Sequence, residues 1–550
     1  MKKKGPNFIE QIIDGDIARG FEKKNLRFRF PPEPNGYLHI GHLKAICLNF
    51  NLGEKYNSPV NLRFDDTNPE KEAKEYVDAI KHDINWLGFN WDKECYASDY
   101  FDQLHGWATD LIKKDLAYID SQTSEEMAMQ KGTPTKQGEL SPFRNRKKEE
   151  SLKIFKEMFD GEHNQGEHVL RAKIDMASPN MLMRDPVLYR VMNVDHHRTK
   201  GDWKVYPMYD WTHGESDYIE QISHSLCTLE FEPHRELYDW FLDAISPIKG
   251  IRPKQREFSR LNLSYTITSK RKLAELVKAK LVEGWDDPRM PTISGLRKRG
   301  YTPEALKNFA LTVGISKREN VIDASLLEFC IRTHLNEVAP RAMGVMNPLK
   351  LKIINYQEAG GEKINFEINP QDKALGTREI NFSSTLYIEK EDFQEYPEEG
   401  FFRLSLGEEV RLKNAYIIKA VDLVKDVGGN ILEVLCEYDK KSKSGSNTPE
   451  SNRRVKGTVH WVSAADTVKA RINVYDRLFK ATEPGKEGDL KSEINENSLE
   501  IKEAYLEPYL AESTEGQQYQ FQRLGYFVRT GNKKTLEFNK TVGLRDGWKK

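Results

Sequence analysis

Two histidines, His39 and His42, stand three residues apart where an expected strand gives way to a helix. They end the segment PPEPNGYLHIGH, residues 31–42. In a first helical turn this spacing puts both imidazoles on one face, beside backbone N–H groups and the positive end of the helix dipole. Gly41 has no side chain, so a flat ring or a phosphate can approach the backbone closely. The arrangement suits a nucleotide triphosphate.

Taken alone, two histidines near a helix start are more often surface or capping residues than ligands. A zinc site would need a third ligand nearby and usually an i, i+4 pair, and the sequence around His39 and His42 shows neither. We therefore expect no metal site.

A second motif, TITSKRKL at residues 266–273, also joins a strand-like run to a helix, which Ser269 is expected to cap. A mobile loop that brings Lys270 to phosphate oxygens would stabilise charge on an α-phosphate and a leaving pyrophosphate. A short run of cations is usually only a solvated helix face. The phosphate interpretation therefore depends on agreement with the first motif.

Asp65 and Asp66 follow the expected strand Val60–Phe64 at its C-terminal end, where open α/β sheets bind ligands. A buried carboxylate is the group that would hold an ammonium ion. Helix capping before Pro69 is the ordinary alternative, and it explains Asp66 better than it explains both residues.

Residues 26–66 predict the βαβ unit that positions these side chains, with a strand at 26–30, a helix from about 41 to 56 and a strand at 60–64. Further helices are expected at 69–88 and 98–115, followed by a polar insert from about 120 to 200 with a helix near 147–159 and a strand at 169–174. Strand-like runs at 203–209 and 258–263 return the chain to the α/β sheet, and short helices follow between 269 and 334.

Beyond Pro340 the chain changes to short β-rich runs separated by turn residues. These runs lie at 410–412, 415–418, 431–435 and 458–462. A stretch of about 200 residues with this character predicts one or two β-barrels. The polar segment 440–447 is expected to be an exposed hairpin tip.

The composition is that of a multidomain protein, since 550 residues exceed what one hydrophobic core supports. A mean hydropathy of -0.70 and the lack of a long apolar run exclude a membrane span. The formal net charge of -1 predicts neither a nucleic-acid partner nor its absence. Five scattered cysteines without a CxxC pair, and a start without an apolar leader, indicate a cytoplasmic protein.

Together the two phosphate motifs resemble the HIGH box and the KMSKS loop of class I aminoacyl-tRNA synthetases. The resemblance runs from about residue 25 to the C-terminus and is strongest to the glutaminyl branch. It also includes the segments FDDTNP (64–69), YPMYD (206–210), HSLCTLEF (224–231), FSRLNL (258–263), DPRMPTI (287–293) and TVGLRD (541–546).

The resemblance implies an α/β fold of several domains. These are an N-terminal extension (1–25), a Rossmann-type catalytic domain (26–118 and 200–268), an acceptor-stem-binding insert (119–199), a helical connector with the signature loop (269–338) and two anticodon-binding β-barrels (339–550). The implied reaction is ATP-dependent ligation of L-glutamine to tRNA(Gln) through a glutaminyl-adenylate, with acyl transfer to the 2′-OH of the terminal adenosine. Mg²⁺ would accompany the ATP, no side-chain nucleophile is needed, and a monomer without a membrane partner is expected.

The resemblance also implies a role for individual residues. Catalytic roles fall to His39, His42 and Lys270. ATP is expected against Glu33, Pro34, Asn35, His39, Ile40, Gly41, His42, Leu43, Lys44, Ala45, Thr228, Arg260, Leu261, Thr268, Ser269 and Lys270. Glutamine is expected to be held at its α-amino group by Asp65 and read near Tyr209, with Arg29, Cys227 and Gln255 close by. Anticodon bases are expected at Arg341, Arg403, Gln520 and Arg523.

Simpler explanations stay open for several of these residues. Tyr209 would also fit a core position with a satisfied hydroxyl, and the four anticodon candidates would also fit as exposed solubilising residues. Thr268 stands where the family pattern has methionine. Pro134, Pro233 and Lys413 also depart from that pattern.

Cys227 separates the glutaminyl from the glutamyl branch, which typically carries arginine at this position. A γ-carboxylate needs such a cation because an unpaired buried charge costs several kcal/mol. A neutral thiol suits a neutral amide, although it is also an ordinary small buried residue. A non-discriminating glutamyl-tRNA synthetase and a catalytically inactive tRNA-binding paralogue remain as alternatives.

Overall fold

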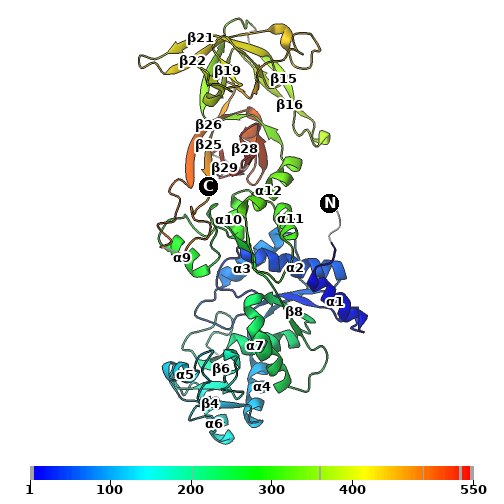
Figure 1. The fold of residues 1–550 in the computed structure, drawn as a ribbon, viewed down its shortest axis with the longest axis vertical. Helices are drawn as coiled ribbons and strands as arrows, with labels where there is room; N and C mark the ends of the chain where they lie inside the picture. Colours follow the sequence, from blue (N-terminus) through cyan, green and yellow to red (C-terminus); the bar gives the residue numbers. More distant parts are fainter. Residues whose placement is uncertain (1–4, 202, 358–360, 487–488, 532–534, 546–550) are drawn as a thin grey trace. The chain divides into compact units, whose positions relative to one another are not determined.

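The computed structural model describes residues 5–201, 203–357, 361–486, 489–531 and 535–545 (Figure 1). The expected segment at 541–546 therefore ends in a residue, Asp546, that lies outside the described part of the chain. The chain forms two compact units. Unit 1 comprises Met1–Leu263 and Ala310–Ile322, and unit 2 comprises Ser264–Phe309 and Asp323–Lys550.

Unit 1 contains the expected parallel sheet. Strand β2 lies between β1 and β3, and β8 pairs in parallel with β9. The bounds are β1 Phe28–Phe30, β2 Val60–Phe64, β3 Glu94–Tyr96, β8 His224–Thr228 and β9 Lys254–Phe258. The Ser223 N–H donates to the Arg27 carbonyl at 3.0 Å, which ties the start of β8 to the start of β1. Because all pairs are parallel, the strands present their C-terminal ends at one edge, as in a Rossmann-type sheet.

The helix α2, Ile40–Tyr56, connects β1 to β2 and agrees with the expected helix within one residue. Its apolar side chains, such as Leu43 and Phe50, are buried. Gly53 allows α2 to approach the sheet, since a Cβ there would lie 2.4 Å from Val60 Cγ2. The other long helices of this unit are α1 Phe8–Ala18, α3 Lys74–Trp86, α4 Phe101–Lys113, α7 Tyr209–Ile219 and α8 Arg235–Ala244.

The polar insert is built on a four-stranded antiparallel sheet of β4 Ala117–Asp120, β5 Val169–Ala172, β6 Val187–Val191 and β7 Val205–Pro207. Helices α5 Ser124–Gln130 and α6 Lys148–Phe159 accompany it. Two strand expectations are wrong here. The run 203–209 supplies β7 to this sheet rather than to the parallel one, and the run 258–263 is broken, because β9 ends at Phe258 and the short β10, Asn262–Leu263, pairs with β11, Val321–Ile322.

Unit 2 contains the helices α9 Lys270–Lys278, α10 Ile293–Lys298 and α12 Ala324–Val338, and the first part of α11 Pro303–Val313. These agree with the short helices expected between 269 and 334. An apolar cluster that includes Ile267, Leu273 and Leu276 fixes α9 and the segment before it.

The rest of unit 2 is two seven-stranded barrel-like sheets, which confirms the expected β-barrels. The first, in spatial order, is β12 Arg341–Ala342, β27 Gln518–Phe521, β28 Gly525–Thr530, β29 Glu537–Val542, β25 Val468–Tyr475, β26 Leu499–Leu506 and β13 Gly344–Val345. The second is β23 Thr458–Val459, β20 Glu409–Leu412, β21 Ile417–Lys425, β22 Ile431–Tyr438, β14 Pro348–Ile353, β17 Thr385–Glu389 and β24 Val462–Ser463. The second sheet is thus inserted in sequence between β13 and β25 of the first.

Three further two-stranded pairs complete the β structure of the described residues. In unit 2, β15 Glu362–Glu367 pairs with β16 Thr377–Phe382, and β18 Phe393–Gln394 pairs with β19 Leu404–Ser405. In unit 1, the pair is β10 with β11.

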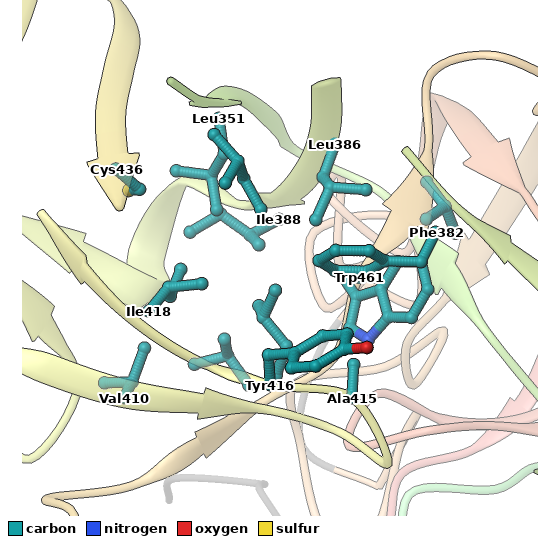
Figure 2. Packing of buried hydrophobic residues seen from close by; sticks show 14 of the residues in the cluster. Leu351, Phe382, Leu386, Ile388, Val410, Ala415, Tyr416, Ile418, Cys436 and Trp461 are labelled. Carbon is teal, nitrogen blue, oxygen red and sulfur yellow. The ribbon is translucent and has the colours of Figure 1, made fainter. Parts of the chain in front are cut away.

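Trp461 is the largest side chain in the core of the second sheet, where it lies against Phe382 (Figure 2). The two ring centroids are 5.4 Å apart and the rings are nearly perpendicular. The indole N–H donates to the Lys413 carbonyl at 3.0 Å, so its one polar atom is satisfied. Trp461 contacts only the backbone of Lys413, so this hydrogen bond does not depend on whether the side chain is lysine or the arginine of the family pattern.

The segment 440–447 is not a hairpin tip, so that expectation is wrong. Strand β22 pairs with β21 and β14, whereas β23 pairs with β20. Ser442 is buried, and its hydroxyl accepts the Ile417 N–H at 2.8 Å. The expected exposure is confirmed for Lys440, Lys441 and residues 445–447, whereas the expected hairpin is not formed. Within the described residues, no helix is long and apolar enough to cross a membrane.

Candidate active site

His39 and His42 lie together at the start of α2, as their spacing predicts. His39 Nδ1 accepts the Gly41 N–H and His42 Nδ1 accepts the His39 N–H, both at 3.1 Å. The ring centroids are 3.9 Å apart. Because a backbone N–H can only donate, each Nδ1 is an acceptor and each neutral ring carries its proton on Nε2. Two Nε2–H donors therefore belong to the first turn of α2, where the helix dipole also favours an anion.

Lys44 is buried one turn further along α2, and its ammonium donates to Ser259 Oγ at 2.9 Å. Burial lowers the pKa of Lys44 to about 8, and the nearby Glu319 carboxylate opposes this shift only in part. This contact connects α2 to the segment after β9, which contains two other expected ATP residues, Arg260 and Leu261. Lys44 thus fixes two segments of the expected ATP site, the first turns of α2 and the segment after β9, relative to each other.

Asp65 lies at the C-terminal edge of β2, and the structure buries it there. Arg63 Nε donates to Asp65 Oδ1 at 2.7 Å, and the Asp65 N–H donates to the Pro32 carbonyl at 3.1 Å. Asp65 Oδ2 is buried and has no hydrogen-bond partner among the described residues. Burial raises the pKa of Asp65 to about 6, although Arg63 opposes the shift. An unsatisfied buried carboxylate oxygen at this edge fits an ammonium group.

Asp66 makes different contacts, and they do not support the alternative that it caps a helix before Pro69. Its Oδ1 accepts the Ser98 N–H at 2.9 Å and its Oδ2 accepts the Ser98 hydroxyl at 2.7 Å. Asp66 therefore fixes the start of the segment after β3, while Asp65 keeps one carboxylate oxygen without a partner among the described residues.

Asp217 on α7 joins two guanidinium groups beneath this site. Arg29 Nε and Arg63 Nη1 donate to Asp217 Oδ1 at 2.9 and 2.7 Å, and the Tyr238 hydroxyl donates to Oδ2 at 3.0 Å. Arg29, Arg63 and Asp217 are all fully buried. Burial alone would raise the pKa of Asp217, but the two arginines outweigh it and hold that pKa well below the usual range. The carboxylate is therefore ionised.

The remaining donors of Arg29 are directed at protein groups. Arg29 Nη1 donates to the Leu226 carbonyl and Nη2 to Ser225 Oγ, both at 2.8 Å. Arg63 Nη1 also contacts Glu220 Oε1 at 3.3 Å, and only its Nη2 has no partner among the described residues. Two guanidinium groups and the carboxylates of Asp65, Asp217 and Glu220 give this network a formal charge of -1.

Tyr209 is the first residue of α7, and its hydroxyl lies 3.1 Å from His213 Nδ1. Arg29 Nη2 lies 3.4 Å from His213 Nε2. Since a guanidinium can only donate, Nε2 is the acceptor and the ring proton sits on Nδ1, which donates to the Tyr209 oxygen. Burial lowers the pKa of His213 to about 3, so the ring is neutral. The Tyr209 hydroxyl therefore keeps its own hydrogen for another acceptor.

Cys227 and Gln255 come from the paired strands β8 and β9, on the face that carries Ser225. Burial raises the pKa of the Cys227 thiol, so the side chain is neutral. Gln255 Nε2 donates to the Phe231 carbonyl at 2.8 Å and to Glu257 Oε1 at 3.0 Å. Its Oε1 is buried and has no partner among the described residues. Gln255 thus contributes an unsatisfied acceptor.

Thr228 lies at the end of β8 and donates from its hydroxyl to Glu230 Oε1 at 2.9 Å. Arg260, which is half exposed, lies near Glu230 and Glu319 at 3.6 and 3.9 Å. Glu33 Oε2 accepts a hydrogen bond from Asn35 Nδ2 in the loop before α2. These expected ATP residues of unit 1 all follow the C-terminal ends of parallel strands.

Thr268, Ser269 and Lys270 belong to unit 2, whereas the other residues expected around ATP belong to unit 1. Lys270 is the first residue of α9. Ser269 occupies the N-cap position, but its side chain makes no capping hydrogen bond, so the expected cap is wrong. Lys272 donates to the Gly485 carbonyl at 2.9 Å, which fixes this helix start against another loop of unit 2.

The four anticodon candidates form two groups in unit 2. Arg341 and Gln520 are register partners in the parallel β12–β27 pair. Arg341 is buried and donates to the Asn336 carbonyl at 2.6 Å, so the alternative of an exposed solubilising residue is wrong for it. Arg403 and Arg523 contact one carboxylate, that of Asp392.

Sequence reasoning missed His213 and Asp217, although a signal was present. Tyr209, His213 and Asp217 are spaced by four residues and therefore share one face of α7. Three residues with polar, titratable or hydroxyl side chains on one buried helix face would have indicated the network.

Sequence reasoning also missed a compact group of Asp66, His196 and His197, whose potential ligand atoms lie within 4.8 Å of one another. His196 Nδ1 accepts the N–H groups of Arg198 and Thr199, both at 3.2 Å. Its proton is then on Nε2, which lies 3.0 Å from the Asp66 carbonyl oxygen and donates to it. Both nitrogens of His196 are committed, so the group fits a structural contact better than a metal site.

Comparison with known proteins gives matches along almost the whole chain. Residues 25–337 match the family described as tRNA synthetases class I (E and Q), catalytic domain. Residues 339–439 and 458–530 match two families described as tRNA synthetases class I (E and Q), anti-codon binding domain.

Proteins named glutamine–tRNA ligase from Shigella dysenteriae serotype 1 and from Citrobacter koseri are each 52% identical over 548 residues, covering 99% of this chain and 98% of theirs. The same values hold for the protein of that name from Escherichia coli O157:H7. A solved glutamate tRNA ligase from Elizabethkingia meningosepticum overlaps 57% of this chain and 70% of its own at a TM-score of 0.42 and 19% identity.

Replacement of Asp217 tests the buried network. Asp217→Asn removes the charge that neutralises Arg29 and Arg63, and breaking a buried ion pair in this way costs about 3–5 kcal/mol. The free energy of unfolding from urea denaturation is expected to fall by that amount. Asp210→Asn on the same helix is the control, because Asp210 is partly exposed and, among the described residues, forms an ion pair only with His234. Equal stability of the two variants would contradict the assigned network.

Proposed function

The chain belongs to the class I (E and Q) tRNA synthetase family, and we propose that within this family it is a glutamine–tRNA ligase. It joins L-glutamine to tRNA(Gln) with consumption of ATP. The observation that carries this assignment is the group at the strand ends, in which Asp65 Oδ2 and Gln255 Oε1 are unsatisfied, the Cys227 thiol is neutral and carboxylates balance the buried arginines. Full-length relatives that share half of its residues support the same reaction.

The phosphates of ATP bind at the start of α2. The Nε2–H groups of His39 and His42 donate to them, and the positive end of the helix dipole adds to the attraction. The ammonium of Lys270, at the start of α9, supplies charge to the α-phosphate and the leaving pyrophosphate. The glutamine carboxylate attacks the α-phosphorus, the bond to the pyrophosphate oxygen breaks, and glutaminyl-adenylate and pyrophosphate form.

Mg²⁺ bound with the nucleotide would neutralise part of the charge of the phosphates. Glu33 is the one acidic residue in the segment 31–42, and a single carboxylate fits an ion that keeps water and phosphate as its main ligands. No side-chain nucleophile takes part, since positioning and electrostatic stabilisation suffice for this transfer.

Glutamine fills the pocket next to the phosphates. Its α-ammonium donates to Asp65 Oδ2, the buried oxygen that the described residues leave unsatisfied. The Tyr209 hydroxyl donates its hydrogen to the carboxamide oxygen, because its oxygen already accepts from His213. Gln255 Oε1 accepts from the carboxamide nitrogen. Both ends of the amide are thereby recognised.

Glutamate is rejected because it brings a second negative charge into a network whose formal charge is already -1. Arg29 donates to Asp217, Leu226 and Ser225, and Arg63 is shared among three carboxylates, with only its Nη2 lacking a partner among the described residues. A buried site without a matching cation discriminates by roughly 10⁴–10⁵ when a required partner is missing. This distinguishes the proposal from a non-discriminating glutamyl enzyme.

The acyl group then passes to the 2′-OH of the terminal adenosine of tRNA, which the insert positions by its acceptor stem. Arg341, Arg403, Gln520 and Arg523 read anticodon bases from the barrels of unit 2. We propose a monomer that acts in the cytoplasm. An inactive tRNA-binding paralogue is not favoured, since His39, His42, Asp65 and Lys270 are all present.

Charging assays with glutamine and glutamate test the proposed function. Wild-type enzyme is expected to prefer glutamine by more than about 1,000-fold in kcat/KM, because the pocket offers no cation to a γ-carboxylate. Cys227→Arg is expected to narrow that preference by about 10–100-fold. Cys227→Ala is the matched control, which keeps a small neutral side chain and the preference. Equal charging of both amino acids by the wild type would reject the assignment.

The pH dependence of glutamine use tests the role of Asp65. Its carboxylate must be ionised to bind the ammonium, and its pKa is about 6, so ionisation is complete above that pH and is lost as the pH falls. Below pH 6, kcat/KM for glutamine is expected to fall about tenfold per pH unit.

Asp65→Asn is expected to raise KM for glutamine and to remove this acid limb. Asp66 is the necessary control because burial raises its pKa to about 7. An acid limb that survives in Asp65→Asn but disappears in Asp66→Asn would assign the titration to Asp66 and contradict the role of Asp65.

A further inference from the structure

Asp392 is a buried carboxylate that contacts two of the four anticodon candidates at once. Arg523 Nη1 donates to Asp392 Oδ2 at 2.5 Å and Nη2 to Oδ1 at 2.7 Å. Arg403 Nε lies 3.1 Å from the same Oδ1. Asp392 is only 1% exposed, whereas the side chains of Arg403 and Arg523 are 45% and 32% exposed. The carboxylate is therefore inside the protein and the two guanidinium groups reach the surface.

Asp392, Arg403 and Arg523 come from loops of both seven-stranded sheets of unit 2. Arg523 lies in the turn between β27 and β28 of the first sheet, and Asp392 and Arg403 lie between β17 and β20 of the second. Arg403 Nη1 also donates to the Glu391 carbonyl at 3.0 Å, so its guanidinium is held at two points. Asp392, together with the Glu391 carbonyl for Arg403, thus fixes the guanidinium groups of Arg403 and Arg523 relative to each other.

Arg523 has a left-handed backbone with φ of 67°, a conformation that a residue with a long side chain rarely adopts. Such conformations persist where the surroundings hold them and are common at ligand sites. His460, which is buried, lies 3.3 Å from Arg523 Nη1 through its Nδ1 and 3.6 Å from Glu389 Oε1 through its Nε2. The Arg523 side chain is therefore supported from a second side.

The charges of this group explain why one carboxylate is needed. Two guanidinium groups that share Oδ1 repel each other, and the Asp392 carboxylate between them offsets that repulsion. A planar guanidinium reads a base edge only when its orientation is fixed, whereas a phosphate accepts any nearby cation. Loss of Asp392 would leave more positive charge but less fixed orientation.

We propose that Asp392 is a positioning residue for anticodon reading, which holds Arg403 and Arg523 as one rigid pair for base edges. This inference rests on the proposed function. It places the effect of Asp392 in discrimination between anticodons rather than in overall tRNA affinity. A merely structural tie between the two sheets would instead weaken stability and the use of all tRNAs alike.

The test compares Asp392→Asn with Asp287→Asn. Asp287 is equally buried in unit 2 and also binds one arginine, Arg289, at 2.7 Å, but among the described residues it forms no ion pair with an anticodon candidate. The measurement is kcat/KM for glutaminylation of tRNA(Gln) and of the same tRNA with one substituted anticodon base. Filter binding of both tRNAs at low salt accompanies it.

Asp392→Asn is expected to reduce the cognate preference at least tenfold, while the substituted tRNA binds as tightly as to wild type or more tightly. Asp287→Asn is expected to keep the wild-type preference. An Asp392→Asn enzyme with the wild-type preference, or with equal losses for both tRNAs, would overturn the proposal. Failure of wild-type enzyme to charge tRNA(Gln) with glutamine would instead reject the proposed function.

Arg523→Lys keeps the test decisive if Asp392→Asn does not fold, because lysine retains the charge but loses the paired contact with the carboxylate. It is expected to lower the cognate preference in the same way, and an unchanged preference would overturn the proposal. Where both variants fold, the double variant is expected to lose less than the sum of the two single losses, since Asp392 acts in part through Arg523. Additive losses would show that Asp392 acts by another route.

Discussion

The amino-acid site depends on the buried ion pairs between Asp217 and two arginines. Arg29 and Arg63 are fully buried, and a buried guanidinium without a partner is costly. Asp217 neutralises both from one position on α7 and thereby keeps them away from the ligand. We propose that selectivity for an uncharged side chain follows from this arrangement, since carboxylates hold both arginines and, of their nitrogens, only Arg63 Nη2 lacks a partner among the described residues.

The parallel sheet makes this arrangement possible. Arg29 comes from β1, Arg63 and Asp65 come from β2 and the segment after it, and Cys227 comes from β8. Parallel strands present their C-terminal ends together, so residues that are distant in sequence meet at one edge. The same edge carries the start of α2, where His39 and His42 accept backbone N–H groups at Nδ1. In the proposed function, this one edge of the sheet binds the amino acid and the nucleotide side by side.

Sequence patterns predicted the elements that carry strong local signals. The βαβ unit agrees closely with the structure because the strand at 60–64 and the helix after His39 have clear hydrophobic periodicity. The run 203–209 was assigned to the wrong sheet, since strand propensity does not reveal which strand a segment pairs with. His213 and Asp217 were missed although their spacing from Tyr209 placed them on its helix face. Asp392 could not be predicted, because its contact with Arg523 spans 131 residues and joins two sheets.

The most direct test of the charge-balanced pocket is a crystal structure of the protein with a non-hydrolysable glutaminyl-adenylate analogue. The α-ammonium should lie about 3 Å from Asp65 Oδ2, the carboxamide should meet Tyr209 and Gln255, and both arginines should remain on Asp217. A structure in which Arg29 or Arg63 leaves Asp217 and binds the side chain of the ligand would contradict the account.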